Sequence, residues 1–337
     1  MPETVFKFLS VVFMLAFSAT VNAQSTYADS VDAGSIDTGS IDTWLDKMSR
    51  ASTQQNFKGT LIIRQNNMLQ AIKVKQGISQ LGSWQTLESL TGEDQTIIRQ
   101  DNKVTTIFPN KKLITIAGND SGGVNKGPLH PTLPENRHII KQFYTLKLSG
   151  QDRVANKMTQ ILKMIPRDKH RYGYTFWLDQ QSGMLLKCDL LDEKGQVLEQ
   201  LMYSNVELLN EAPLNNIDTE KLSLYRKINL SDKSDVSSKS WQAKQLPDGF
   251  TLTRSVKAGS DNTESGASYH MVFSDGMASV SVFIEQGKNQ DEPVIGQSSM
   301  GPVNAYSSFV NDTYVTAIGE VPAATVRMIA TSIQPVE

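Results

Sequence analysis

One pattern in this sequence limits the possible folds more than any other: apolar and polar residues alternate, with a period of two, in a series of short runs between Phe57 and about residue 206. In the first run, Leu61 and Ile63 fall on the same side as Phe57, whereas Lys58 and Arg64 fall on the other. Such alternation is typical of a strand with one dry face. Short turn signals of Asn, Asp, Gly and Pro separate the runs and predict antiparallel hairpins. The further predicted strands are Gln70–Lys75, Ser83–Leu90, Thr96–Arg99, Lys103–Phe108, Leu113–Ala117, Tyr172–Leu178, Met184–Leu191 and Val197–Val206.

Two helices are expected beside these strands. The first has Asp42 or Thr43 available as its N-cap, and its apolar face consists of Trp44, Leu45, Met48 and Ala51. The second begins at Pro134 and contains Ile139, Ile140, Phe143 and Tyr144. A large sheet with one dry face has to cover that face, so we expect it to curl around these helices.

The enclosed apolar side chains allow two interpretations. They could line a hollow that holds an acyl chain, or they could fill an ordinary core. If there is a lipid cavity, its candidate residues are Trp44, Met48, Phe57, Leu61, Ile63, Phe108, Phe143, Tyr174 and Phe176.

The amino terminus predicts export. Residues 6–17 form an apolar block, and the small-residue site Val21-Asn22-Ala23 follows it, as in a cleaved signal peptide over residues 1–23. The alternative is an uncleaved anchor, because Lys7 is the only basic residue at the start of the block and Glu3 offsets it. An exported chain without a second anchor is expected in the periplasm or outside the cell, and the periplasm is our prediction. Cys188 is the only cysteine, which excludes an intramolecular disulfide and favours a buried strand residue over a reactive thiol.

Shifts in composition divide the rest of the chain. Residues 24–41 carry a tandem Gly-Ser-Ile-Asp-Thr repeat and predict a disordered leader. Residues 118–134 are rich in Gly, Pro, Asn and Ser and predict a long loop, either a lid or a binding loop. Residues 229–240 have almost no apolar content and predict a linker. We therefore expect a first domain over 42–228 and a second over 241–337.

The second domain is expected to be a compact α+β module. Leu246-Pro247-Asp248-Gly249-Phe250 predicts a turn before a strand, and Ser274-Asp275-Gly276 joins the two arms of a hairpin. Strands are predicted at Ala305–Phe309 and Tyr314–Gly319, and a final helix follows Pro322.

Motifs for catalysis are missing from the sequence. It contains no G-x-S-x-G elbow, no H-E-x-x-H, no P-loop and no G-x-G-x-x-G, and its histidines (130, 138, 170 and 270) lack metal-ligand spacing. The net charge of −2 gives no reason to expect nucleic acid as a partner. We therefore expect no enzyme activity, no metal and no cofactor.

Two charged clusters have more than one interpretation. Asp189, Asp192 and Glu193 lie close together in sequence, but a solvated hairpin turn explains them better than a calcium loop. The cluster of Arg167, Lys169, His170 and Arg171 could pair with lipid phosphates or could be a charged turn.

Several segments together resemble one family. They are Arg171-Tyr172-Gly173-Tyr174-Thr175-Phe176-Trp177-Leu178-Asp179, the hairpin from Asp189 to Gln200, Leu246-Pro247-Asp248-Gly249-Phe250, Phe273-Ser274-Asp275-Gly276 and Gly319-Glu320-Val321-Pro322. Their order and their spread from about residue 44 to the end resemble the RseB/MucB family. The leader, the Gly-rich loop and residues 62–100 depart from the family pattern, which affects the choice of ligand more than the fold.

The resemblance implies a fold and a function. The expected fold is mainly β (α+β): a LolA/LolB-like unclosed antiparallel β-barrel around helices, followed by a smaller α+β antiparallel-sheet domain. The expected function is negative regulation of the sigma-E (AlgU-type) envelope-stress response. Members of the family bind the periplasmic domain of the anti-sigma factor RseA/MucA, shield it from the stress protease and are released by lipopolysaccharide-type lipid. The sequence leaves open whether the chain forms a homo-oligomer.

Two other classes of function compete with this one. A periplasmic lipid or lipoprotein carrier would need only the first domain, so the second domain argues for a protein partner. A periplasmic hydrolase would need a nucleophile, a base and an orienting group, and the sequence offers no recognisable set.

Overall fold

The computed structural model describes residues 40–80, 82–100, 103–118, 133, 137–214, 222–229, 240–258, 268–286, 295–310 and 313–336. The predicted signal peptide lies outside these residues, as do nearly all of the leader, most of the 118–134 loop and most of the 229–240 linker. Within the described part of the chain, no helix is both long and apolar enough to span a membrane.

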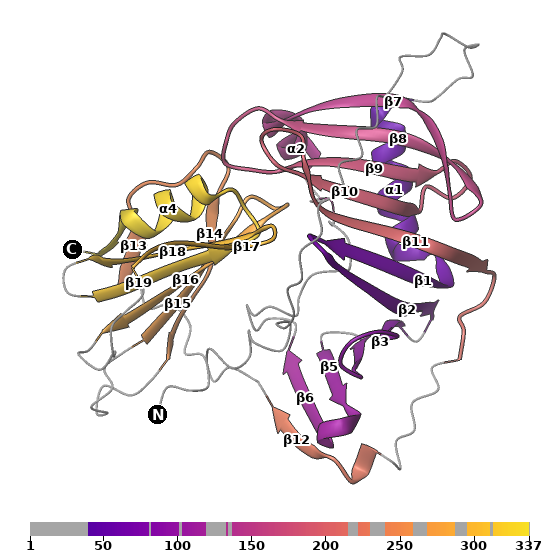
Figure 1. The fold of residues 1–337 in the computed structure, drawn as a ribbon, viewed down its shortest axis with the longest axis horizontal. Helices are drawn as coiled ribbons and strands as arrows, with labels where there is room; N and C mark the ends of the chain where they lie inside the picture. The colour runs from indigo at the N-terminus through magenta and orange to yellow at the C-terminus, as the bar shows by residue number, and fades with distance from the viewer. Residues whose placement is uncertain are drawn as a thin grey trace. The chain divides into compact units, whose positions relative to one another are not determined.

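A 12-stranded sheet forms the larger part of the described structure (Figure 1). Its strands are β1 (Asn56–Gln65), β2 (Met68–Ser79), β3 (Gly82–Ser89), β4 (Thr96–Gln100), β5 (Lys103–Phe108), β6 (Leu113–Gly118), β7 (Tyr144–Val154), β8 (Lys157–Pro166), β9 (Gly173–Asp179), β10 (Leu185–Leu191), β11 (Val197–Leu209) and β12 (Arg226–Asn229). Their spatial order is β12-β6-β5-β4-β3-β2-β1-β11-β10-β9-β8-β7. The edge strands β12 and β7 do not pair with each other, so the sheet is unclosed, as expected.

The hairpins follow the predicted order. Neighbouring strands of this sheet pair antiparallel, except that β12 runs parallel to β6. In β1, Phe57 and Leu61 are buried and Arg64 is exposed, which confirms the predicted dry face. All residues of β9 are buried, because its outer face is covered as well: Lys187 Nζ lies 3.8 Å from the centre of the Trp177 ring.

Some strands were not predicted. The alternation in β7 is interrupted where its register with β8 shifts between Leu148 and Gln151, and a bulge of this kind removes the period-two signal. β12 is only four residues long and mostly exposed. The expectation that Tyr144 belongs to the second helix is wrong: the helix ends at Phe143, and Tyr144 is the first residue of β7.

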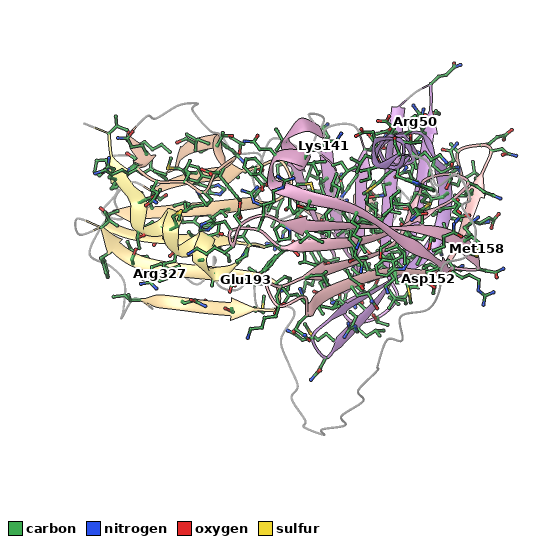
Figure 2. All side chains as sticks on the ribbon, turned by 90° about the horizontal axis from the view of Figure 1, so that it is seen from above. Arg50, Lys141, Asp152, Met158, Glu193 and Arg327 are labelled. Carbon is green, nitrogen blue, oxygen red and sulfur yellow. The ribbon has the colours of Figure 1, made fainter. Side chains whose placement is uncertain are left out.

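Helix α1 (Ile41–Gln54) packs its apolar face against one side of the large sheet, near β10. Trp44, Leu45, Met48 and Ala51 are buried, as predicted, whereas Arg50 lies on the exposed side (Figure 2). The N-cap prediction is wrong: Ser40 Oγ accepts the hydrogen bond from the backbone N–H of Thr43. Asp42 instead pairs with Lys141 of α2 (Arg137–Phe143), with 2.7 Å between Oδ1 and Nζ.

A separate six-stranded antiparallel sheet forms the C-terminal part, in the order β14-β15-β16-β19-β18-β17. Its strands are β14 (Thr251–Ala258), β15 (Ser268–Ser274), β16 (Ser279–Gln286), β17 (Gly296–Met300), β18 (Val303–Val310) and β19 (Thr313–Gly319). Strand β17 was not predicted, because its sequence Gly-Gln-Ser-Ser-Met has no apolar alternation.

One helix covers one face of the smaller sheet (Figure 1). Helix α4 (Ala323–Ser332) follows Pro322, as predicted, and buries Val326, Ile329 and Ala330 against β18 and β19. The short strands β13 (Trp241–Ala243) and β20 (Ile333–Pro335) pair antiparallel beside it. The C-terminal part is therefore an α+β module with its own core.

We expect Leu45→Ala to lower the free energy of unfolding by about 2–5 kcal/mol, because Leu45 is fully buried between α1 and the sheet. Arg50→Ala, on the exposed side of the same helix, should change it by less than about 0.5 kcal/mol. Urea unfolding followed by tryptophan fluorescence measures both. Equal stability of the two variants would show that α1 is not part of the core.

Candidate functional site: an apolar interior and an arginine junction

The structure brings most of the predicted cavity residues together. One cluster of buried residues contains seven of them, and the partly buried Ile63 packs against it. The seven are Trp44, Met48, Phe57, Leu61, Phe143, Tyr174 and Phe176. We call this cluster the apolar interior. It lies between α1, α2 and the face of the sheet formed by β1, β2, β3 and β7–β11. Phe108 stands apart: it is the last residue of β5 and does not belong to the cluster, and Lys111 Nζ lies 5.2 Å from the centre of its ring.

Aromatic side chains run through the apolar interior. The rings of Tyr174 and Phe176 stack with centres 5.6 Å apart, and Tyr144 lies 6.4 Å from Tyr174. Tyr203 meets Phe57 edge-on at 5.9 Å. Tyr203 was not singled out from the sequence, although it occupies a predicted strand in the same alternation as Leu201.

The same face of the sheet carries a row of polar side chains beyond the apolar ones. Gln76 on β2, Gln85 on β3 and Arg99 on β4 are cross-strand neighbours, and we call them the polar row. Arg99 Nη1 donates to Gln85 Oε1 at 3.2 Å, and Gln85 Nε2 donates to Gln76 Oε1 at 3.2 Å. Gln76 Nε2 in turn donates to the backbone oxygens of Ser52 and Gln55 at the end of α1.

A second feature is centred on Arg171, which is 1% exposed and lies in the turn between β8 and β9. Its Nε donates to both carboxylate oxygens of Asp168, its Nη1 lies 2.7 Å from Asp275 Oδ2, and its Nη2 donates to the backbone oxygen of Asp248. The guanidinium also lies 4.2 Å from the centre of the Phe143 ring. We call these contacts the arginine junction, and they connect the two sheets within the compact unit 40–337.

The arginine junction brings together in space three motifs that are far apart in the sequence. Arg171 precedes the Tyr-Gly-Tyr strand, Asp248 belongs to Leu-Pro-Asp-Gly-Phe, and Asp275 belongs to Phe-Ser-Asp-Gly. Gly249 has a positive φ of 84°, and a Cβ there would collide with the Phe143 ring. Glycine is therefore required both by the backbone and by the close approach of the ring.

Further hydrogen bonds surround the junction. Tyr172 Oη donates to the backbone oxygen of Pro302 at 3.0 Å, and Asn304 Nδ2 donates to Tyr172 Oη at 2.9 Å. Burial raises the pKa of Tyr172 to about 12, so its hydroxyl stays protonated and remains a donor at neutral pH. Thr325 Oγ1, near the start of α4, donates to the backbone oxygen of His170 at 2.8 Å.

These contacts settle the role of one member of the basic cluster at 167–171. Arg171 is enclosed by two aspartates and a backbone oxygen, so it is not available to a lipid phosphate. Arg167 and Lys169 are exposed on the turn.

The acidic residues at 189–193 belong to a hairpin. Asp192 Oδ1 accepts from the backbone N–H groups of Lys194 and Gln196, as in a hairpin turn. Asp189 is buried and accepts from Gln200 Nε2 at 2.6 Å.

Burial raises the pKa of the Cys188 thiol well above its ordinary value, which keeps it an unreactive core residue. In the described ranges, no three or more His, Cys, Asp and Glu side chains are grouped so that they could hold a metal ion.

Fold and site together define a class: a two-part, mainly β binding protein, in which an apolar interior in one part is joined to a second sheet by a buried ion pair. The model of the MucB/RseB N-terminal domain matches residues 40–223, and that of the MucB/RseB C-terminal domain matches residues 235–334. The chain belongs to the MucB/RseB family.

Known relatives agree with this assignment. The chain is 29% identical over 300 residues to the sigma factor AlgU regulatory protein MucB of Pseudomonas aeruginosa, covering 87% of this chain and 90% of the relative. It is 25% identical over 296 residues to the sigma-E factor regulatory protein RseB of Haemophilus influenzae, covering 86% and 90%. The solved structure of the Pseudomonas aeruginosa MucA/MucB complex is similar with a TM-score of 0.68 at 28% identity, covering 88% of this chain and 98% of that one.

We expect Arg171→Met to lower the free energy of unfolding by about 3–5 kcal/mol, because it leaves the buried Asp275 carboxylate without its cation. Arg167→Met removes an exposed arginine from the same turn and should change stability by less than about 0.5 kcal/mol. Thermal and urea unfolding measure the difference. If the two variants were equally stable, Arg171 would not be a determinant of this structure.

Proposed function

We propose that this chain is a periplasmic, non-enzymatic regulator of the sigma-E (AlgU-type) envelope-stress response. In this proposal it binds the periplasmic domain of a membrane anti-sigma factor of the RseA/MucA type and shields it from the stress protease, and lipopolysaccharide-type lipid releases it. The observation that carries the proposal is the likeness to MucB solved in complex with the periplasmic domain of MucA, with 27% identity and a TM-score of 0.66 over 88% of this chain.

The proposed release by lipid follows from linkage. A lipid that binds the free regulator better than the complexed one must weaken the complex by the same factor by which the partner weakens lipid binding. The proposed lipid site is the apolar interior, whose aromatic residues reach from β9 to Tyr144, next to Phe143. Because Phe143 also contacts the guanidinium of Arg171, the proposed lipid site and the arginine junction share a side chain.

A second candidate function is supported by the apolar interior alone. A periplasmic carrier of lipids or lipoproteins would use the large sheet in the same way. The C-terminal module, with its own core and with buried contacts to the segment 168–172, favours a protein partner instead. The two functions differ in whether an anti-sigma factor binds.

We expect the chain without its predicted signal peptide to bind the periplasmic domain of the anti-sigma factor from the same organism, and lipopolysaccharide to weaken that binding. Calorimetric titration with and without lipopolysaccharide measures both effects. A folded chain that does not bind the anti-sigma factor would exclude the regulator and leave the carrier. Binding that lipid leaves unchanged would exclude only the release step.

We expect Ile63→Gln to reduce the effect of lipopolysaccharide on this complex at least several-fold, because Ile63 packs against the apolar interior. The matched control is Ile62→Gln, since Ile62 is the preceding residue of β1 and points to the opposite face of the sheet. Both residues are partly exposed, so both variants should fold. Equal lipid responses in the two variants would place the lipid elsewhere.

A further inference from the structure

Arg99 occupies an unusual position, because it lies on the same side of the sheet as α1. It pairs in register with Gln85, which pairs with Gln76, which pairs with the buried Phe57. Cross-strand partners point to the same face, and the bonds from Gln76 to the backbone of α1 identify that face as the inner one. The guanidinium of Arg99 is therefore directed to the face that carries the apolar interior.

The charge of Arg99 is poorly compensated there. Its side chain is partly buried, and the Nε atom is inaccessible to solvent and has no hydrogen-bond partner. Its one hydrogen bond to a side chain goes to the neutral amide of Gln85, and no acidic residue in the described part of the chain forms an ion pair with it. Burial lowers the pKa of Arg99, which reflects the cost of keeping its charge in this place.

The surroundings of Arg99 indicate what would compensate the charge. A guanidinium presents paired N–H donors that match the oxygens of a phosphate or a carboxylate. Arg99 lies three strands from Phe57, about 14 Å along the sheet at the usual strand spacing. Buried apolar side chains and a cation thus follow each other on one face, in the order of the tail and head of an anionic amphiphile.

We propose that Arg99 binds the oxyanion head group of an acylated ligand whose chains lie against the apolar interior. This inference rests on the lipid part of the proposed function and names the residue that would select for charge in the ligand. Gln85 and Gln76 hold the guanidinium from one side, and they connect it to the end of α1. The Nη N–H groups that do not bind Gln85 are left for the head group.

A purely structural role for Arg99 makes a different prediction. If Arg99 only connects β4 to β3 and α1, its replacement should lower the stability of the chain and weaken the binding of all ligands alike. If it binds a head group, its replacement should weaken the binding of charged ligands and leave the binding of uncharged ligands of the same chain length unchanged. The comparison of two amphiphiles therefore separates the two roles.

The test is calorimetric titration of the full chain without its predicted signal peptide, with three probes. These are dodecyl phosphate and dodecyl maltoside, both below their micelle-forming concentrations, and inorganic phosphate. We expect Arg99→Gln to weaken the binding of dodecyl phosphate at least tenfold and to leave the binding of dodecyl maltoside unchanged. Arg99→Lys keeps the charge but loses the paired donors, so its affinity for dodecyl phosphate should lie between that of Arg99→Gln and that of the unsubstituted chain. The matched control is Arg64→Gln, because Arg64 is exposed on the other face of β1.

Each outcome decides the proposal. Selective loss of dodecyl phosphate binding in Arg99→Gln supports it. Unchanged binding, equal loss of both amphiphiles, or the same loss in Arg64→Gln overturns it while the proposed regulator stands. If inorganic phosphate binds as tightly as dodecyl phosphate, the site is one for free anions and the lipid head group is excluded. If the unsubstituted chain binds neither amphiphile, the lipid part of the proposed function fails with it.

Discussion

Burying a guanidinium costs several kcal/mol unless its donors are satisfied, and Arg171 satisfies them with groups from distant parts of the chain. Asp168 comes from its own turn, whereas Asp275 and the backbone oxygen of Asp248 come from the C-terminal part. The Phe143 ring lies against the guanidinium and also against Gly249. The contact between the two sheets therefore depends on this ion, because neither side of the junction can move away without leaving an unpaired charge.

The inner face of the large sheet has two chemically different regions. The aromatic and aliphatic side chains of β1 and β7–β11 meet α1 and α2 in one buried cluster. The polar row on β2–β4 continues the same face with two amides and one cation. Apolar contacts are not directional, whereas a guanidinium demands paired oxygen acceptors, so the first region would accept many chains and the second few head groups.

The predictions from sequence succeeded where one period dominated. The strands β1–β6 and β9–β11 and the helices α1 and α4 carry a clear apolar periodicity, so local pattern and tertiary burial agree. Strand β7 was missed because its bulge shifts the period, and β17 because it has no apolar face. The N-cap of α1 was misplaced because Ser40 and Asp42 are equally good caps by sequence, and Asp42 is instead used by Lys141.

Sequence information was sufficient to show that this chain builds consecutive hairpins with an apolar side, that it belongs to the RseB/MucB type, and that Cys188 forms no intramolecular disulfide. The roles of the charged residues depend instead on how distant segments pack together. Arg171 and Asp275 are 104 residues apart, and nothing in the local pattern of either indicates the other. The periodicity of apolar residues and the turn residues depend only on a few neighbours in the sequence. The burial of a charge depends on every segment that packs around it. For that reason Arg171 could be taken for a surface charge, and Arg99 for an ordinary strand residue, until the sheets were in place.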